Sequence, residues 1–164
     1  ETAFGRLSTG YRTIFKDIVA LCVPADYILL DEPVLGLDAG HRDLFYKELI
    51  TTFANRPRTF IIATHLIEEV ESLLNNVVVI DEGQVKLAEP VDQLMERSYR
   101  LVGPADDMTA FLKDVQVLSQ ETFANETRAI VTMIGTPEMP NTIKKQALNL
   151  QDLFVALTEG HHEN

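Results

Sequence analysis

Two short apolar runs, each ending abruptly in polar residues, set the strongest limit on how this chain can fold. They are YILLDEP at residues 27–33 and TFIIATH at residues 59–65. Between them, residues 36–54 carry apolar side chains at helical spacing after Asp38, a suitable N-cap. This order of strand, helix and strand predicts an α/β fold, a parallel sheet covered by helices on both faces.

The other segments before Ser98 continue the same pattern. Residues 8–23 predict a helix with Ser8 as its N-cap and an apolar face of Ile14, Phe15, Ile18, Val19 and Cys22. After the second run, the sequence predicts a helix at 66–74, a strand at 77–81, its hairpin partner at 84–89 and a short helix at 90–97. We therefore assign residues 1–97 to one α/β domain.

The pattern of predicted strands and helices changes at Ser98. From there it predicts a strand at 99–103, a helix at 104–114, two strands at 115–123 and 128–135, and a last helix at 149–160. The last helix should turn Leu150, Leu153, Phe154 and Leu157 inward. Residues 98–164 are predicted to form a small α+β accessory domain.

Composition excludes several classes of function. The 164 residues carry a net charge of −11 and no cluster of Lys and Arg, which argues against nucleic acid and anionic lipid as partners. Cys22 is the single cysteine, so we expect a packed side chain rather than a disulfide or a thiolate metal site. No apolar run approaches the roughly 18 residues of a membrane span. Because the chain begins with Glu1 and not Met, we expect it to be a piece of a longer protein.

Acidic residues stand at the end of the first predicted strand. In parallel sheets ligands collect at the carboxyl ends of the strands, where Asp31, Glu32 and His65 all fall. Such a pair suits a nucleoside triphosphatase, with Asp31 on Mg²⁺ and Glu32 deprotonating the attacking water. The alternative is a pair of solvated acids that end a strand.

The start of the first predicted helix offers a second candidate site. The unpaired N–H groups at Ser8, Thr9 and Gly10 are suited to hold a phosphate. A phosphate loop of the G-x-x-x-x-G-K-[ST] type is absent, since none of the eight glycines precedes a lysine. The sequence thus carries half of a nucleotide site.

Taken in order, LSTGY, YILLDEP, LGLD and ATH resemble the nucleotide-binding subunit of ATP-binding cassette (ABC) transporters, over residues 7–94. The resemblance implies the C-terminal portion of a P-loop NTPase fold, with Asp31 and Glu32 in the Walker B strand, Asp38 in the D-loop and His65 as the switch histidine. It places the signature motif at Leu7, Ser8, Thr9, Gly10 and Tyr11.

Two residues depart from the usual Leu-Ser-Gly-Gly-Gln signature. Thr9 replaces the first glycine, and Tyr11 replaces the glutamine. Thr9 either crowds a phosphate or adds a donor to it. The phosphate loop, the glutamine loop and the adenine-stacking aromatic residue of the family are expected to precede Glu1.

The resemblance also implies a function. Two such subunits sandwich two ATP molecules with Mg²⁺, and together they drive a transmembrane permease. Glu32 would be the base, His65 the γ-phosphate sensor and Asp31 the Mg²⁺ ligand, with Ser8 and Gly10 supplied in trans. The subunit would lie in the cytoplasm, on the inner face of the membrane, touching the membrane through its permease.

Three points stay open at the level of the sequence. The last helix is similar to that of bacterial export subunits, which favours export, and the partner subunit is either identical or different. A non-transport ATPase of the same superfamily, acting in translation or DNA repair, is an alternative. A binding or regulatory module without its own activity is another, and we expect the fragment alone to be inactive.

Overall fold

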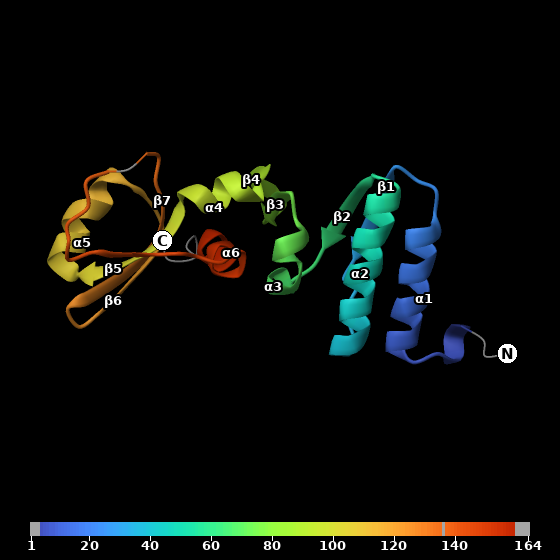
Figure 1. Ribbon diagram of the computed structural model, residues 1–164. Helices are drawn as coiled ribbons and strands as arrows, with labels where there is room; N and C mark the ends of the chain where they lie inside the picture. The colour runs from blue at the N-terminus through green and yellow to red at the C-terminus, as the bar shows by residue number, and fades with distance from the viewer. Residues whose placement is uncertain (1–3, 136, 160–164) are drawn as a thin grey trace. The chain divides into compact units, whose positions relative to one another are not determined.

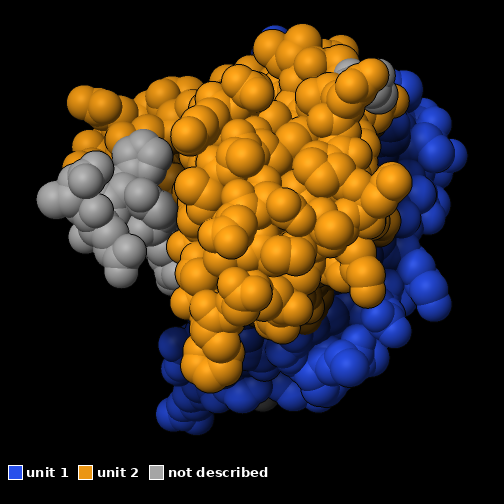
Figure 2. Space-filling view, turned by 90° about the vertical axis from the view of Figure 1, so that its left-hand side faces the viewer, with its two compact units in different colours: residues 1–65 blue, residues 66–164 orange. Residues whose placement is uncertain are grey.

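The computed structural model describes residues 4–135 and 137–159. The chain divides into two compact units, residues 1–65 and 66–164, which Figure 2 distinguishes by colour. Figure 1 shows the order of the elements along the chain.

The first unit is an α/β layer built on two parallel strands. After a short 3₁₀ turn it contains α1 (Thr9–Cys22), β1 (Tyr27–Asp31), α2 (Ala39–Asn55) and β2 (Thr59–Ala63). The strands pair in register from Tyr27 opposite Thr59 to Asp31 opposite Ala63. Helices α1 and α2 lie side by side and contact each other (Figure 1). The strand–helix–strand pattern predicted from the two apolar runs is therefore present.

Helices cover one face of this pair within the unit, which corrects the expectation of two covered faces. Ile28 and Leu30 are buried, and so are Phe45 and Leu49 of α2. On the opposite face of β1, Leu29 is 75% exposed. An uninterrupted apolar run cannot distinguish a strand covered on both sides from one whose second side has no partner in its own unit.

Helix α1 also differs from its expected packing. Its predicted apolar face is largely in solvent, with Phe15 and Ile18 both more than half exposed. Cys22 is exposed as well, so the expectation that it packs in a core is wrong. The buried residue of this helix is Asp17. Helical spacing located the apolar stripe correctly, but it did not show which side of the helix meets the unit.

The second unit begins with a short helical segment and a hairpin. These are α3 (Ile67–Val70), a 3₁₀ turn (Glu71–Leu73), β3 (Asn76–Asp81) and β4 (Gln84–Pro90). Strand β3 pairs antiparallel with β4. Among the described residues, parallel pairing is thus confined to β1 and β2, and the third predicted strand does not extend it.

The rest of the second unit is an antiparallel α+β region. It comprises α4 (Val91–Arg97), β5 (Ser98–Pro104), α5 (Ala105–Phe111), a 3₁₀ turn (Leu112–Asp114), β6 (Gln116–Phe123), β7 (Glu126–Thr132), β8 (Lys144–Gln146) and α6 (Leu150–Glu159). The four strands run in the order β6-β7-β5-β8. Strand β8 was not expected from the sequence, and Gly160 of the last predicted helix lies outside the described residues.

Two clusters of buried side chains stabilise this unit. One joins β5, β7 and α5 around Leu101, Met108 and Val131. The other joins α4 to α6 and includes Leu94 and Leu153, both almost fully buried. As predicted, α6 turns Leu150 and Leu153 inward, with Phe154 and Leu157 partly buried. The second cluster draws on residues from both sides of Ser98, the predicted start of the accessory domain.

Candidate functional site

Glu32 stands where β1 and β2 end side by side. Its N–H donates to the carbonyl oxygen of Ala63 at 2.8 Å, one step beyond the last paired residues of the two strands. The backbone of Glu32 then takes a left-handed conformation, with φ of 46°. A non-glycine residue in this region is strained, and such strain persists where the surrounding structure fixes it, often at functional sites.

The carboxylate of Glu32 is bound by two consecutive residues that follow β2. His65 Nδ1 lies 2.7 Å from Oε1, and the His65 backbone N–H donates to the same oxygen at 3.1 Å. The hydroxyl of Thr64 donates to Oε2 at 3.0 Å. Both oxygens are therefore engaged from one short segment, and the sequence-predicted base and switch histidine are in direct contact.

These contacts change the acidity of Glu32. Partial burial raises its pKa, but three hydrogen bonds together outweigh that effect: from the His65 side chain, the Thr64 hydroxyl and the His65 backbone. The net result is a pKa below the ordinary value for glutamate. The side chain is thus a carboxylate that accepts hydrogen bonds at neutral pH, and the proton between it and His65 resides on Nδ1.

Asp31 ends β1 in an exposed position beside Glu32. Among the described residues, no group of three or more His, Cys, Asp or Glu side chains is arranged to hold a metal ion. Mg²⁺ commonly uses one or two carboxylates and takes its other ligands from water and substrate phosphates. Asp31 therefore fits a Mg²⁺ ion that arrives with a nucleotide, but not one held by the protein alone.

The predicted signature segment forms the turn that starts α1. Ser8 caps the helix as predicted, since its hydroxyl accepts from the Tyr11 N–H at 3.3 Å. The Arg12 side chain donates to the carbonyl oxygens of Leu7 and Gly5. These contacts fix the backbone of the segment that precedes α1. The first-turn N–H groups of Thr9 and Gly10 have no intrahelical partners, as at any helix start.

The predicted D-loop packs against this same turn. A Cβ added to Gly10 would lie 3.1 Å from the Gly36 carbonyl oxygen, so glycine permits the close approach of the two backbones. The hydroxyl of Thr13 lies 3.2 Å from the Leu35 carbonyl oxygen, to which it donates. The structure therefore brings the predicted signature turn and the predicted D-loop together.

Asp38 ends the predicted D-loop, and it caps α2 as expected from the sequence. It accepts from the His41 N–H at 3.0 Å and pairs with the His41 ring. The hydrogen bond from the His41 backbone is the main cause of its lowered pKa. The Arg42 side chain donates to the Leu37 carbonyl oxygen and holds the loop.

Sequence reasoning missed the supporting residues of these sites. They are Arg12, Thr13, Arg42 and Thr64, which hold backbone or carboxylate groups of the predicted site residues. Their contacts depend on the folded path of the loops. Thr64 alone had a usable signal, because it immediately precedes His65 at the end of a predicted strand.

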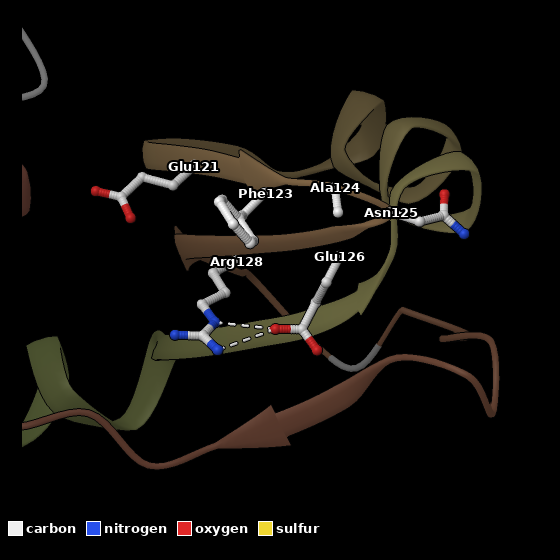
Figure 3. A pocket seen from close by; sticks show the side chains of 6 residues that line it. All are labelled: Glu121, Phe123, Ala124, Asn125, Glu126 and Arg128. Carbon is white, nitrogen blue, oxygen red and sulfur yellow. Dashed lines mark hydrogen bonds and ion pairs between the residues drawn. The ribbon is translucent and has the colours of Figure 1, made fainter.

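A hollow elsewhere on the chain does not belong to these sites. It lies on the β6–β7 hairpin and is lined by Glu121, Phe123, Ala124, Asn125, Glu126 and Arg128 (Figure 3). Arg128 is paired with Glu126 at 3.0 Å. None of the predicted site residues contributes to it.

Comparison with known proteins shows that the chain is similar to ABC transporter ATP-binding proteins. The Nod factor export ATP-binding protein I of Burkholderia orbicola is 30% identical over 172 residues, a match that spans 96% of this chain and 55% of the relative. The ABC transporter ATP-binding protein NatA of Bacillus subtilis is 33% identical over 92 residues, covering 56% of this chain and 37% of NatA. The chain thus spans about half the length, or less, of these curated relatives.

No family model matches the chain. A solved structure of an inward-facing ABC transporter of metal-chelate type aligns with a TM-score of 0.44 and 19% identity, over 80% of this chain and 50% of that one. In the described part of the chain, no helix has the length and apolar character needed to cross a membrane.

Proposed function

We propose, from the premise that this chain is a partial ABC transporter ATP-binding protein, that it supplies the hydrolytic half of an ATPase subunit that drives transport. The observation that carries the proposal is the contact between Glu32 and His65, in which a carboxylate at one strand end is held by an imidazole just beyond the next. ATP hydrolysis is the chemistry that this pair serves best.

Glu32 acts as the general base in the proposed reaction. The oxygen of a water molecule attacks the γ-phosphorus of ATP, and its proton passes to the Glu32 carboxylate. The bond from the γ-phosphorus to the bridging oxygen breaks, and its electron pair leaves with ADP. The products are ADP and inorganic phosphate.

His65 links this base to the nucleotide. With its Nδ1–H directed at Glu32, the imidazole has Nε2 available for a γ-phosphate oxygen. A hydrogen bond from Nε2 to that oxygen requires a second proton on the ring.

The remaining partners follow from the same proposal. Mg²⁺ bound to ATP would neutralise phosphate charge and take Asp31 as its protein ligand. Ser8 and Gly10, with Leu7, Thr9 and Tyr11 around them, would meet the γ-phosphate of ATP held by a second subunit, and Asp38 would lie at that interface. A transmembrane permease would hold the pair at the cytoplasmic face of the membrane, and the name of the Burkholderia relative favours export.

Replacement of Glu32 tests the catalytic role. In the complete protein that contains this chain, Glu32→Gln should retain ATP binding and lose at least about a hundredfold in hydrolysis rate, because an amide cannot accept the proton. Steady-state phosphate release and nucleotide binding should be measured on the same sample. Glu48→Gln is the matched control, an exposed glutamate on α2 that should leave both unchanged. Normal turnover by Glu32→Gln would refute the proposal.

A further inference from the structure

We infer that Thr64 is a positioning residue for the catalytic carboxylate: its hydroxyl fixes the plane of the Glu32 carboxylate and selects the oxygen that receives the proton. The inference rests on the proposed function, because it requires Glu32 to be the base. It adds a residue to the site that neither the motifs nor the relatives assign a role.

The geometry of the two strand ends carries this inference. Asp31 pairs with Ala63 at the end of the two strands, and Glu32 and Thr64 are the residues that follow them along the chain. The Glu32 N–H still bonds to the Ala63 carbonyl oxygen, so its backbone is anchored to β2. The left-handed turn at Glu32 then directs its carboxylate to the residues that follow β2.

The two carboxylate oxygens are bound differently. Oε1 accepts two hydrogen bonds, both from His65, whereas Oε2 accepts one, from the Thr64 hydroxyl. A carboxylate oxygen has two lone pairs, so Oε1 is saturated by these contacts and Oε2 keeps one lone pair. Oε2 is therefore the oxygen suited to take a proton from water.

The hydroxyl supplies what His65 alone cannot. Contacts at one oxygen leave a carboxylate free to rotate about its last side-chain bond, because such bonds have broad torsional preferences. A second, charge-assisted bond at the other oxygen removes this freedom. Holding a base in the orientation for attack is a recognised source of rate enhancement.

The test replaces Thr64 in the complete protein. Thr64→Val keeps the branched shape and removes the hydroxyl, whereas Thr64→Ser keeps the hydroxyl. For Thr64→Val we expect kcat for ATP hydrolysis to fall about tenfold to a hundredfold, with KM for ATP changed less than twofold. The kcat of Thr64→Ser should stay within about threefold of the parent value. This change is smaller than the one expected when a hydrogen bond to a charged group is lost.

The pH profile separates positioning from general damage. Loss of a hydrogen bond to the charged carboxylate raises its pKa, so the acid limb of kcat should move to higher pH in Thr64→Val but not in Thr64→Ser. Thr59→Val, at the exposed start of the same strand, is the control for replacing threonine by valine in β2 and should change neither kcat nor the profile.

Several outcomes would overturn the inference. Unchanged kcat and pH profile in Thr64→Val would show that the hydroxyl has no positioning role. Equal losses in Thr64→Ser and Thr64→Val would show that the effect does not follow the hydroxyl, because Thr64→Ser keeps it. Normal turnover by Glu32→Gln would instead refute the proposed function, whereas an inactive Glu32→Gln with a normal Thr64→Val refutes the role of Thr64 alone.

Discussion

At the scale of single residues, the buried Asp17 makes the stability of the chain depend on pH. This carboxyl lies on the inner side of α1, and its Oδ2 has no hydrogen-bond partner among the described residues. Burial raises its pKa from 3.8 to about 6, with a smaller opposing effect from Lys16. Because the folded state holds the proton more tightly, stability is lost as the pH rises from 3.8 to about 6.

Asp17→Asn should remove this loss. Above pH 6 the buried charge costs up to about 3 kcal/mol, so the variant should unfold at higher denaturant concentration than the parent at pH 7.5. Below pH 3.8 both proteins are neutral at this site, and the difference should vanish. Chemical unfolding at pH 7.5 and at a pH below 3.8 measures the effect. Replacement of the exposed Asp43 by asparagine is the control. An equal gain at both pH values would contradict the electrostatic explanation.

At the scale of elements, the N-terminus of α6 is held by a side chain from far along the chain. Glu71, in the turn after α3, accepts from the Leu150 N–H at 3.1 Å. A carboxylate at a helix start satisfies an unpaired donor and complements the helix dipole. An ion pair also joins α6 to β5, because Arg100 lies 2.8 Å from the carboxylate of Asp152. Polar contacts thus fix the start of α6, and Leu153 in the next turn packs in the buried cluster that α6 shares with α4.

Removal of the Glu71 carboxylate should weaken this attachment. We expect Glu71→Ala to lower the free energy of unfolding by about 1 kcal/mol, as for the loss of other N-terminal caps. Glu71→Gln should retain most of it, since the amide oxygen also accepts. Glu68→Ala, an exposed glutamate on α3, is the control. Thermal melts followed by circular dichroism would decide, and a normal melt for Glu71→Ala would rule out the cap.

Helix caps and the ends of helices and strands could be predicted from the sequence where they depend on residues close by in the chain. The caps at Ser8 and Asp38 and the ends of α1 and β1 follow from nearby residue types, and the structure has them as expected. The contact of Glu32 with His65 was predictable because parallel strands end at one edge. The cap supplied by Glu71 and the hydroxyl of Thr64 were not, since both depend on folded geometry that no spacing rule encodes.

At the scale of the whole molecule, the core between α4 and α6 makes the position of a domain boundary testable. The sequence places the start of an accessory domain at Ser98, whereas the compact units divide after His65. A fragment of residues 98–164 lacks Val91 and Leu94, which pack in the same cluster as Leu153. A fragment of residues 66–164 retains them.

We therefore expect the longer fragment to unfold cooperatively and the shorter one to be much less stable. Loss of one large buried side chain commonly costs about 2–5 kcal/mol, and α4 contributes two to this core. Differential scanning calorimetry of both fragments, with binding of a hydrophobic dye as a second probe, measures the difference. Equal stability of the two fragments would favour an independent domain from Ser98 onward.

The exposed position of Cys22 has a practical consequence for studying this chain. A single accessible thiol accepts one maleimide fluorophore or nitroxide without prior removal of other cysteines. The label would sit at the last residue of the helix that Ser8 begins, on a side chain outside the buried core. In the two-subunit ATPase proposed above, spectroscopic distances between two such labels would follow the separation of the two copies of this helix.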